Sequence, residues 1–189
     1  MTILHIDSSI QTEGSVSRQL TAAIVAAVAE PGETVIHHDL TTETPAAVNP
    51  RAGDSPAADE FLAADVIVIG APMYNLGVPS RLKAWIDSIS IPRKTFRYTE
   101  KGPEGLAGGR RVIVAYASGG FHSGPEEDFV DAYLRSLFRL LGIKDIDVVR
   151  AEGVNISDEH KARALAAADA EIAAIAARFR AERRQAVDA

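Results

Sequence analysis

One stretch constrains the fold of this chain more than any other: an unbroken β-branched run from Val66 to Ile69, with a loop and then a helix behind it. A run that is apolar at every position is typical of a strand buried on both faces of a parallel sheet. The residues from Gly70 to Gly77 are expected to end that strand and form a loop. Pro79 and Ser80 open a helix whose apolar face carries Leu82, Trp85, Ile86 and Ile89. Ligands of α/β sheets bind outside the carboxyl ends of the strands, where this loop would lie.

Strands and helices alternate along the rest of the chain. The expected strands are Thr2–Ile6, Thr34–Leu40, Asp65–Ile69, Arg111–Ala117 and Asp145–Arg150. The expected helices are Ser15–Ala29, Ala57–Ala63, Ser80–Ser90, Glu126–Leu141 and Ser157–Arg183, and Pro92–Gly109 is expected to be a long loop. Right-handed crossovers between such units predict an α/β fold with helices on both faces of one parallel sheet. We therefore expect a single domain over residues 1–189, a flavodoxin-like, doubly wound, five-stranded parallel sheet of order 2-1-3-4-5.

Composition excludes several classes of function. A net charge of −6 without a basic stripe argues against nucleic-acid binding, and no apolar run reaches the ~20 residues of a membrane helix. Cysteine is absent, which excludes thiol catalysis, disulfides and cysteine-based metal sites. His5, His37 and His38 lie in predicted strands without metal-ligand spacing and are interpreted as structural, so no metal site is expected. Asp7 directly follows the first apolar residues, so the long apolar core of a signal peptide is missing. A cytoplasmic protein is therefore the default expectation.

In the strand order 2-1-3-4-5, the loops 8–17, 71–78 and 117–124 should meet at one edge of the sheet. The first loop carries Ser9, Ser15 and Ser17 at the entrance of a helix. Hydroxyls beside the free N–H groups of a helix N-terminus can hold a phosphate, although Ser15 can equally be a simple N-cap. The glycine patterns of a P-loop and of a dinucleotide-binding Rossmann fold are both missing here.

The other two loops offer a different kind of surface. Loop 71–78 contains Met73, Tyr74, Asn75 and Leu76, which combine flat or soft apolar side chains with backbone donors. Loop 117–124 contains Ser118, Gly119 and Gly120, where missing side chains let the backbone approach a ligand closely. The serine hydroxyls of the first loop can bind a phosphate, the apolar side chains of the second can contact a flat ring, and the glycines of the third let the backbone approach it. Together the three loops predict a site for a planar heteroaromatic phosphate.

Three motifs resemble those of the FMN-dependent NADH:quinone oxidoreductases known as azoreductases. They are Met73-Tyr-Asn-Leu-Gly-Val-Pro-Ser-Arg-Leu-Lys-Ala-Trp-Ile-Asp87, Phe96-Arg-Tyr-Thr-Glu-Lys-Gly-Pro-Glu-Gly-Leu106 and Ser118-Gly-Gly-Phe-His122. The resemblance runs from the first strand nearly to the C-terminus. It implies a homodimer with one FMN per subunit at the dimer interface, NADH as hydride donor, and quinones or azo compounds as acceptors.

The resemblance also implies a role for individual residues. The phosphate and ribityl end of FMN would be bound by Ser9, Ser15, Val16 and Ser17. The flavin ring would be lined by Met73, Tyr74, Asn75 and Leu76, with the Asn75 N–H near ring nitrogen N5, and its pyrimidine side would be approached by Ala117, Ser118, Gly119 and Gly120. The substrate pocket would be walled by Phe96 and Tyr98, in part from the partner subunit, with His122 near the substrate. The expected reaction is a ping-pong hydride transfer that needs no side-chain nucleophile or acid–base group. His122 is the one candidate catalytic residue, as a hydrogen-bond donor to the reduced acceptor or to flavin O2, and the alternative is that it is a bystander.

Two departures from the family pattern bear on the site. The family commonly has Ser-Arg-Gly-Gly after the fourth strand, whereas Ala117 and Ser118 lose one hydroxyl and one cation here. The segment Thr41–Ala64 is shorter than usual in the family, which bears on the range of substrates.

Two rival functions share this strand order. A response-regulator receiver would need an acceptor Asp at the end of the third strand, where Gly70–Pro72 lies instead. A flavodoxin-type FMN electron carrier would be more acidic and would not need the segment from Phe96 to Leu106.

Overall fold

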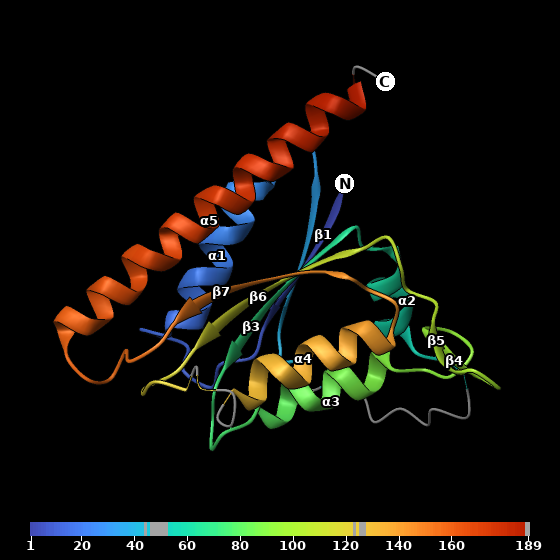
Figure 1. Ribbon diagram of the computed structural model, residues 1–189, viewed down its shortest axis with the longest axis horizontal. Coiled ribbons are helices and arrows are strands. Elements are labelled where there is room, and N and C mark those ends of the chain that lie inside the picture. The colour runs from blue at the N-terminus through green and yellow to red at the C-terminus, as the bar shows by residue number, and fades with distance from the viewer. Residues whose placement is uncertain (44, 46–52, 123, 125–127, 188–189) are drawn as a thin grey trace.

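A five-stranded sheet with helices on both faces forms the centre of the molecule (Figure 1). The computed structural model describes residues 1–43, 45, 53–122, 124 and 128–187. The strands are β1 Thr2–Asp7, β2 Thr34–Asp39, β3 Val66–Pro72, β6 Arg111–Ala117 and β7 Asp145–Ala151. They pair in parallel in the order β2-β1-β3-β6-β7, which is the predicted order 2-1-3-4-5 with β2 at an edge.

The helices divide into two groups (Figure 1). One face of the sheet carries α1 Val16–Val28 and α5 Asp158–Val187, and the other carries α2 Pro56–Ala63, α3 Ser80–Ile89 and α4 Phe129–Leu140. Side chains of successive strand residues point to opposite faces, so the sheet separates two apolar cores. On β3, Val68 packs with the α1–α5 core and Ile67 and Ile69 pack with the other. None of the helices in the described residues is long and apolar enough to cross a membrane.

The third strand is longer than its sequence predicts. We expected Gly70 to break it, but Gly70, Ala71 and Pro72 continue the strand and pair with Ala115, Tyr116 and Ala117 of β6. Small residues suit this position, because a Cβ on Gly70 would lie 3.3 Å from the side chain of Thr21 on α1. The expected loop therefore begins at Met73.

The expected long loop Pro92–Gly109 instead contains a β-hairpin, β4 Phe96–Thr99 and β5 Gly102–Gly105. Its strands are antiparallel, and the hairpin lies beside the C-terminal ends of α3 and α4 (Figure 1). Gly105 lies directly on the backbone of Gly142, since a Cβ on Gly105 would be 2.0 Å from the Gly142 nitrogen. Local sequence carries no strong sign of this contact, which joins residues far apart in the chain.

Gly142 follows the C-cap of α4, with a φ of +91° that suits glycine. The expected first turn at Glu126 lies outside the described residues, and α4 begins at Phe129 with Asp128 as N-cap. The buried face of α4 carries Val130, Leu134 and Phe138, whereas Phe129 is half exposed.

The contact between Gly105 and Gly142 makes one substitution strongly destabilising. We expect Gly105→Ala to lower the free energy of unfolding by about 3 kcal/mol, because two backbones would have to separate to admit the methyl group. Gly108→Ala is the matched control, since a Cβ there would be at an ordinary 3.4 Å from the Gly142 carbonyl oxygen. Urea unfolding of the three proteins measures the difference, and equal stability of the two variants would contradict the packing described here.

Candidate functional site

The loops after β1, β3 and β6 meet at the carboxyl edge of the sheet, as the strand order predicts. They enclose a cavity of about 190 Å³. Its lining residues come from four segments: Ser9, Gln11, Gly14, Ser15, Val16 and Ser17; Pro72, Met73 and Tyr74; Ala117, Ser118 and Gly119; and Val154, Asn155 and Lys161. Nine predicted cofactor residues are therefore brought together: Ser9, Ser15, Val16, Ser17, Met73, Tyr74, Ala117, Ser118 and Gly119.

Buried hydroxyl groups surround the N-terminus of α1. Ser15 is the N-cap, with its Oγ accepting a hydrogen bond from the Arg18 N–H, and it lies 3.3 Å from the Oγ of Ser17. Ser9 Oγ is 3.0 Å from the hydroxyl of Tyr74. The first turn of α1 contains no acidic residue. This end of the cavity therefore combines hydroxyl donors with the positive end of a helix dipole and suits an anion such as a phosphate.

An ion pair, the Arg18–Asp39 brace, connects the serine loop (residues 8–17) to the edge strand β2. Arg18 on α1 donates hydrogen bonds of 2.8 and 2.7 Å to the carboxylate of Asp39 on β2, and a third of 2.8 Å to the Ser9 carbonyl oxygen. The Arg18 guanidinium holds the pKa of Asp39 well below its ordinary value, and hydrogen bonds from Thr41 add to this effect. The bidentate geometry fixes Arg18 and through it the backbone at Ser9.

The second loop is a tight and strained turn. Tyr74 and Gly77 exchange backbone hydrogen bonds of 2.9 and 3.1 Å, while Asn75 and Leu76 between them have φ values of +50° and +64°. Two positive φ values are the mark of a type I′ turn, in which glycine usually follows asparagine. A leucine in the left-handed region costs about 1 kcal/mol or more, and strain of this kind gathers at functional sites. Leu76 is also half exposed, at the tip of the turn.

The third loop is held against the chain that follows β7. Backbone hydrogen bonds run from Val154 to the Ser118 carbonyl, from Asn155 to that of Gly119 and from Gly153 to that of Gly120. A Cβ on Gly119 would lie 2.7 Å from Nδ2 of Asn155, so only glycine fits between this side chain and the cavity. The Ser118 hydroxyl donates to the Gly120 carbonyl oxygen at 2.8 Å.

Sequence reasoning missed the segment after β7, which brings Val154, Asn155 and Lys161 to the cavity. The signal was present, because the fifth strand neighbours the fourth in the predicted order and its following loop opens on the same edge. Lys161 adds a positive charge at the cavity wall. Asn155, a polar uncharged residue, gives no strong sign in the sequence.

Other predicted site residues stand outside this cavity. Asn75 and Leu76 line a neighbouring groove, and Gly120 lies beside His122, whose N–H donates to Glu152 at 2.9 Å. Phe96 is buried in the core beneath the hairpin, with Tyr98 edge-on against it at 5.4 Å. Tyr98 is 77% exposed. The two aromatic residues therefore lie away from the cavity of their own chain.

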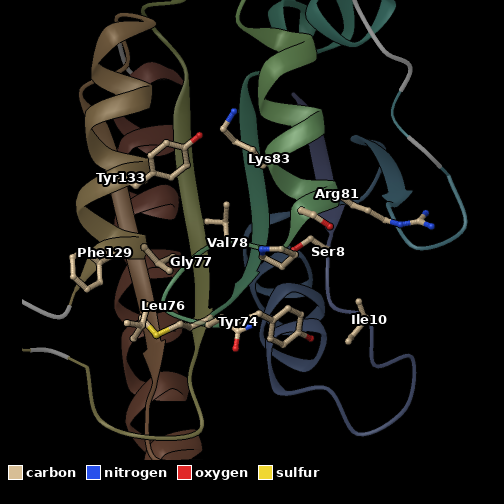
Figure 2. Close-up of a pocket in the computed structure, with 15 residues that line it drawn as sticks. Ser8, Ile10, Tyr74, Leu76, Gly77, Val78, Arg81, Lys83, Phe129 and Tyr133 are labelled. Atoms are coloured by element: carbon tan, nitrogen blue, oxygen red, sulfur yellow. The ribbon is translucent and has the colours of Figure 1, made fainter.

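The neighbouring groove, of about 1060 Å³, runs between α3 and α4 and reaches the strained turn (Figure 2). Tyr133 from α4 and Lys83 from α3 stand on facing sides of it, and Phe129 and Leu76 lie at its lower end. Arg81 extends away from the groove to the carbonyl oxygens of Leu40 and Thr41. The groove is thus open and largely apolar near the turn.

Comparisons with known proteins agree with this geometry. The sequence model of a family described as flavodoxin-like fold matches residues 1–176. An FMN-dependent NADH:quinone oxidoreductase of Xanthomonas oryzae pv. oryzae is 51% identical over 180 aligned positions, in an alignment that covers 89% of this chain and 93% of the relative. A second protein of that name, numbered 2 and from Pseudomonas aeruginosa, is 45% identical over 196 aligned positions, gaps included, in an alignment that covers 92% of this chain and 97% of the relative.

Solved structures give the same result. A Bacillus anthracis azoreductase superposes with a TM-score of 0.82 at 28% identity, covering 93% of this chain and 98% of that one. An FMN-dependent NADH-azoreductase of the same species, solved in complex with FMN, gives a TM-score of 0.82 at 27% identity over 94% and 98% of the two chains.

The Arg18–Asp39 brace predicts how stability depends on pH. A carboxylate whose pKa is lowered by folding stabilises the protein above its ordinary value of about 3.8 and loses that contribution as the pH falls towards its folded pKa. We expect Asp39→Asn to cost about 2 kcal/mol at pH 7, the worth of hydrogen bonds to a charged group, and the cost to shrink below about pH 4. Urea unfolding between pH 7 and pH 3 measures it.

The control for this prediction is Asp87→Asn, which removes an exposed partner of Lys83 on α3. An exposed ion pair of this kind contributes about 0.5 kcal/mol or less. A cost of Asp39→Asn that is no larger than that of the control, or that stays constant down to pH 3, would contradict the proposed brace.

Proposed function

This chain belongs to the family described as flavodoxin-like fold, and from that premise we propose that it is an FMN-dependent NADH:quinone oxidoreductase that also reduces azo compounds. The observation that carries the proposal is the cavity in which the hydroxyls at the N-terminus of α1 meet the strained turn after β3 and the glycine after β6. The relatives that bear this name cover nearly the whole chain, so the proposal extends to one FMN-binding domain over residues 1–189.

The residues present fit an FMN phosphate. Ser15 and Ser17 offer hydroxyls at the positive end of α1, and Ser9 offers another beside Tyr74. Lys161 supplies a cation at the cavity wall, although Ala117 and Ser118 lack the arginine and one hydroxyl that the azoreductase motif carries. The cavity therefore keeps a positive charge, which comes from the segment after β7.

The turn after β3 and the backbone at Gly119 fit the flavin ring. Tyr74 and Gly77 satisfy each other's backbone groups, which leaves the N–H groups of Asn75 and Leu76 outside the turn's own hydrogen bonds. Gly119 lets the backbone come close where a side chain would collide with Asn155. Met73 presents soft apolar surface to the cavity, held in place by the hydrogen bond from its N–H to the Ala117 carbonyl oxygen at 2.8 Å.

Bound FMN would supply the redox chemistry, accepting a hydride from NADH and delivering two electrons to the acceptor. The protein's task is then to position the ring and to stabilise negative charge with backbone dipoles from the loop 118–120. No side-chain nucleophile is needed, and the absence of cysteine from the sequence is compatible with this. His122, adjacent to this loop, is proposed to lie near the acceptor, and donor and acceptor are proposed to use one place in turn.

We further propose that two copies of the chain form the complete site. A cavity of about 190 Å³ is smaller than the roughly 300–1,000 Å³ usual for sites of this kind, so one chain leaves the ring exposed. The groove between α3 and α4 carries the half-exposed Leu76 and Phe129, which a second copy can cover. Phe96 and Tyr98 do not line their own cavity, and the exposed Tyr98 is proposed to line the partner's cavity. A cytoplasmic location remains a prediction.

Flavin reduction by NADH alone tests the proposed reaction. We expect the purified protein to be yellow, and its flavin absorbance to bleach when NADH is added without oxygen or acceptor, because the donor step is complete before the acceptor binds. Stopped-flow absorbance measures the rate. Bleaching that requires a quinone to be present would refute the alternating use of one place, and a protein that bleaches but does not turn over NADH with quinones would be an electron carrier.

Removal of one buried hydroxyl tests whether Ser17 binds the FMN phosphate. We expect Ser17→Ala to raise the Kd for FMN about 10- to 100-fold, since a hydrogen bond to a charged group contributes about 1.5–3 kcal/mol. Ser90→Ala, which removes a hydroxyl bonded to the Ile86 carbonyl at the end of α3, is the matched control and should leave the Kd unchanged. Fluorescence titration of apoprotein with FMN gives both values, and equal Kd values would place the phosphate elsewhere.

A further inference from the structure

Two neighbouring strands place three metal-binding side chains together, away from the cavity described above. His5 and Asp7 are two residues apart on β1, so both side chains point to the face of the sheet that α1 covers. His37 on β2 is the register partner of His5, which places its side chain beside them. Among the described residues, His5, Asp7 and His37 form a group whose ligand atoms all lie within 4.8 Å of one another.

The distances in this group are those of a coordination site. His37 Nε2 lies 3.0 Å from Asp7 Oδ2, and His5 Nε2 lies 3.5 Å from the same oxygen. Zinc binds imidazole nitrogen and carboxylate oxygen at about 2.0–2.1 Å, so two of its ligands in a tetrahedral site are about 3.3 Å apart. The two imidazole rings are 4.3 Å apart, and their Nε2 atoms converge on one carboxylate oxygen.

A second observation points to a ligand. The Nε2 atom of His5 is buried and makes no hydrogen bond within the described part of the chain, and His5 as a whole is only 8% exposed. Buried polar atoms in native proteins are nearly always satisfied, so an orphan nitrogen of this kind calls for an ion or a water molecule. In its neutral form, an imidazole whose Nε2 is deprotonated beside a carboxylate is a ligand for a divalent transition metal.

We propose that His5, Asp7 and His37 bind one divalent transition-metal ion of the zinc type. Two imidazoles and one carboxylate are three protein ligands, and a water molecule would complete the tetrahedron. The side chain of His37 is 48% exposed, which gives the ion a route from solvent. Thr21 on α1 donates a hydrogen bond of 2.8 Å to Asp7 Oδ1 and so fixes the carboxylate with its other oxygen towards the two histidines.

One neighbouring charge opposes the ion. Arg18 Nη1 lies 3.7 Å from Asp7 Oδ2. However, both terminal nitrogens of Arg18 are bonded to Asp39 at 2.8 and 2.7 Å, so most of its charge is already compensated. In the absence of metal, His37 and Asp7 can share a hydrogen bond at 3.0 Å, which is the competing arrangement that the experiment must distinguish.

The consequence of binding follows from the topology. Within the described sheet, β2 is an edge strand that pairs with β1 alone. An ion held by His5, Asp7 and His37 would clamp β2 to β1, and through Thr21 it would also hold α1 in place. The site is therefore structural, and its occupancy is separable from flavin binding and from turnover.

The test uses the FMN-loaded protein, freed of metals with a chelator and titrated with zinc chloride in a calorimeter. Three proteins are compared: wild type, His37→Gln, and the control His38→Gln. His38 is the adjacent strand residue and is bonded to Glu43 and Glu60 instead, so the control also tests the nearest rival donor set. Because His37 is partly exposed, its replacement should preserve folding, which circular dichroism and FMN content verify.

We expect wild type and His38→Gln to bind one zinc ion per chain and His37→Gln to bind zinc at least about tenfold more weakly. Zinc should raise the Tm of wild type and of His38→Gln but not that of His37→Gln. The proposal is overturned if wild type shows no saturable binding, if His37→Gln and wild type bind alike, or if only His38→Gln loses the ion. Full FMN content in all three proteins keeps a failure here distinct from a failure of the flavin proposal.

Discussion

The pairing of β3 with β6 is the interaction on which the site depends. The two strands are in register over the whole of β3, from Val66 opposite Arg111 to Pro72 opposite Ala117, and the hydrogen bond from Met73 to the Ala117 carbonyl extends the ladder by one step. Both loops that would contact a flavin ring leave the sheet at this point. A shift of one residue in register would turn every side chain of β3 to the other face, so the same pairing fixes the two cores and the separation of the loops.

Next to the β3–β6 pair, the site contains one strained turn and one ion pair that holds a loop in place. The turn at Asn75 and Leu76 holds two residues in a costly left-handed conformation, and the exchange of hydrogen bonds between Tyr74 and Gly77 keeps them there. On the other side, Arg18 connects the serine loop to the edge strand through Asp39. The cavity is therefore preformed by main-chain hydrogen bonds and one ion pair, which is what a cofactor site needs if positioning is the protein's main contribution.

Patterns within short windows predicted much of this architecture. The β-branched run of β3 and the Ser15 cap of α1 each depend on their own neighbourhood, and the structure has both as expected. The errors share one cause. The segment from Gly70 to Pro72 is predicted to break β3 but continues it, because the partner residues that accept it, Ala115 to Ala117, lie 45 positions later in the chain. The hairpin was missed because Gly105 is held by Gly142, a contact invisible to local propensity.

By itself the sequence determined the alternation of strands and helices, their order in the sheet, and the nucleotide-site motifs, since these follow from periodicity, capping and turn chemistry. Only the tertiary structure decided which side chains from separate segments meet. The fold places Lys161 and Asn155 at the cavity, whereas Phe96 and Tyr98 do not line the cavity of their own chain. It also places His37 beside His5 and Asp7. The physical reason is that strand register and helix packing place residues in space by contacts distant in sequence, and a one-dimensional pattern carries no record of those distances.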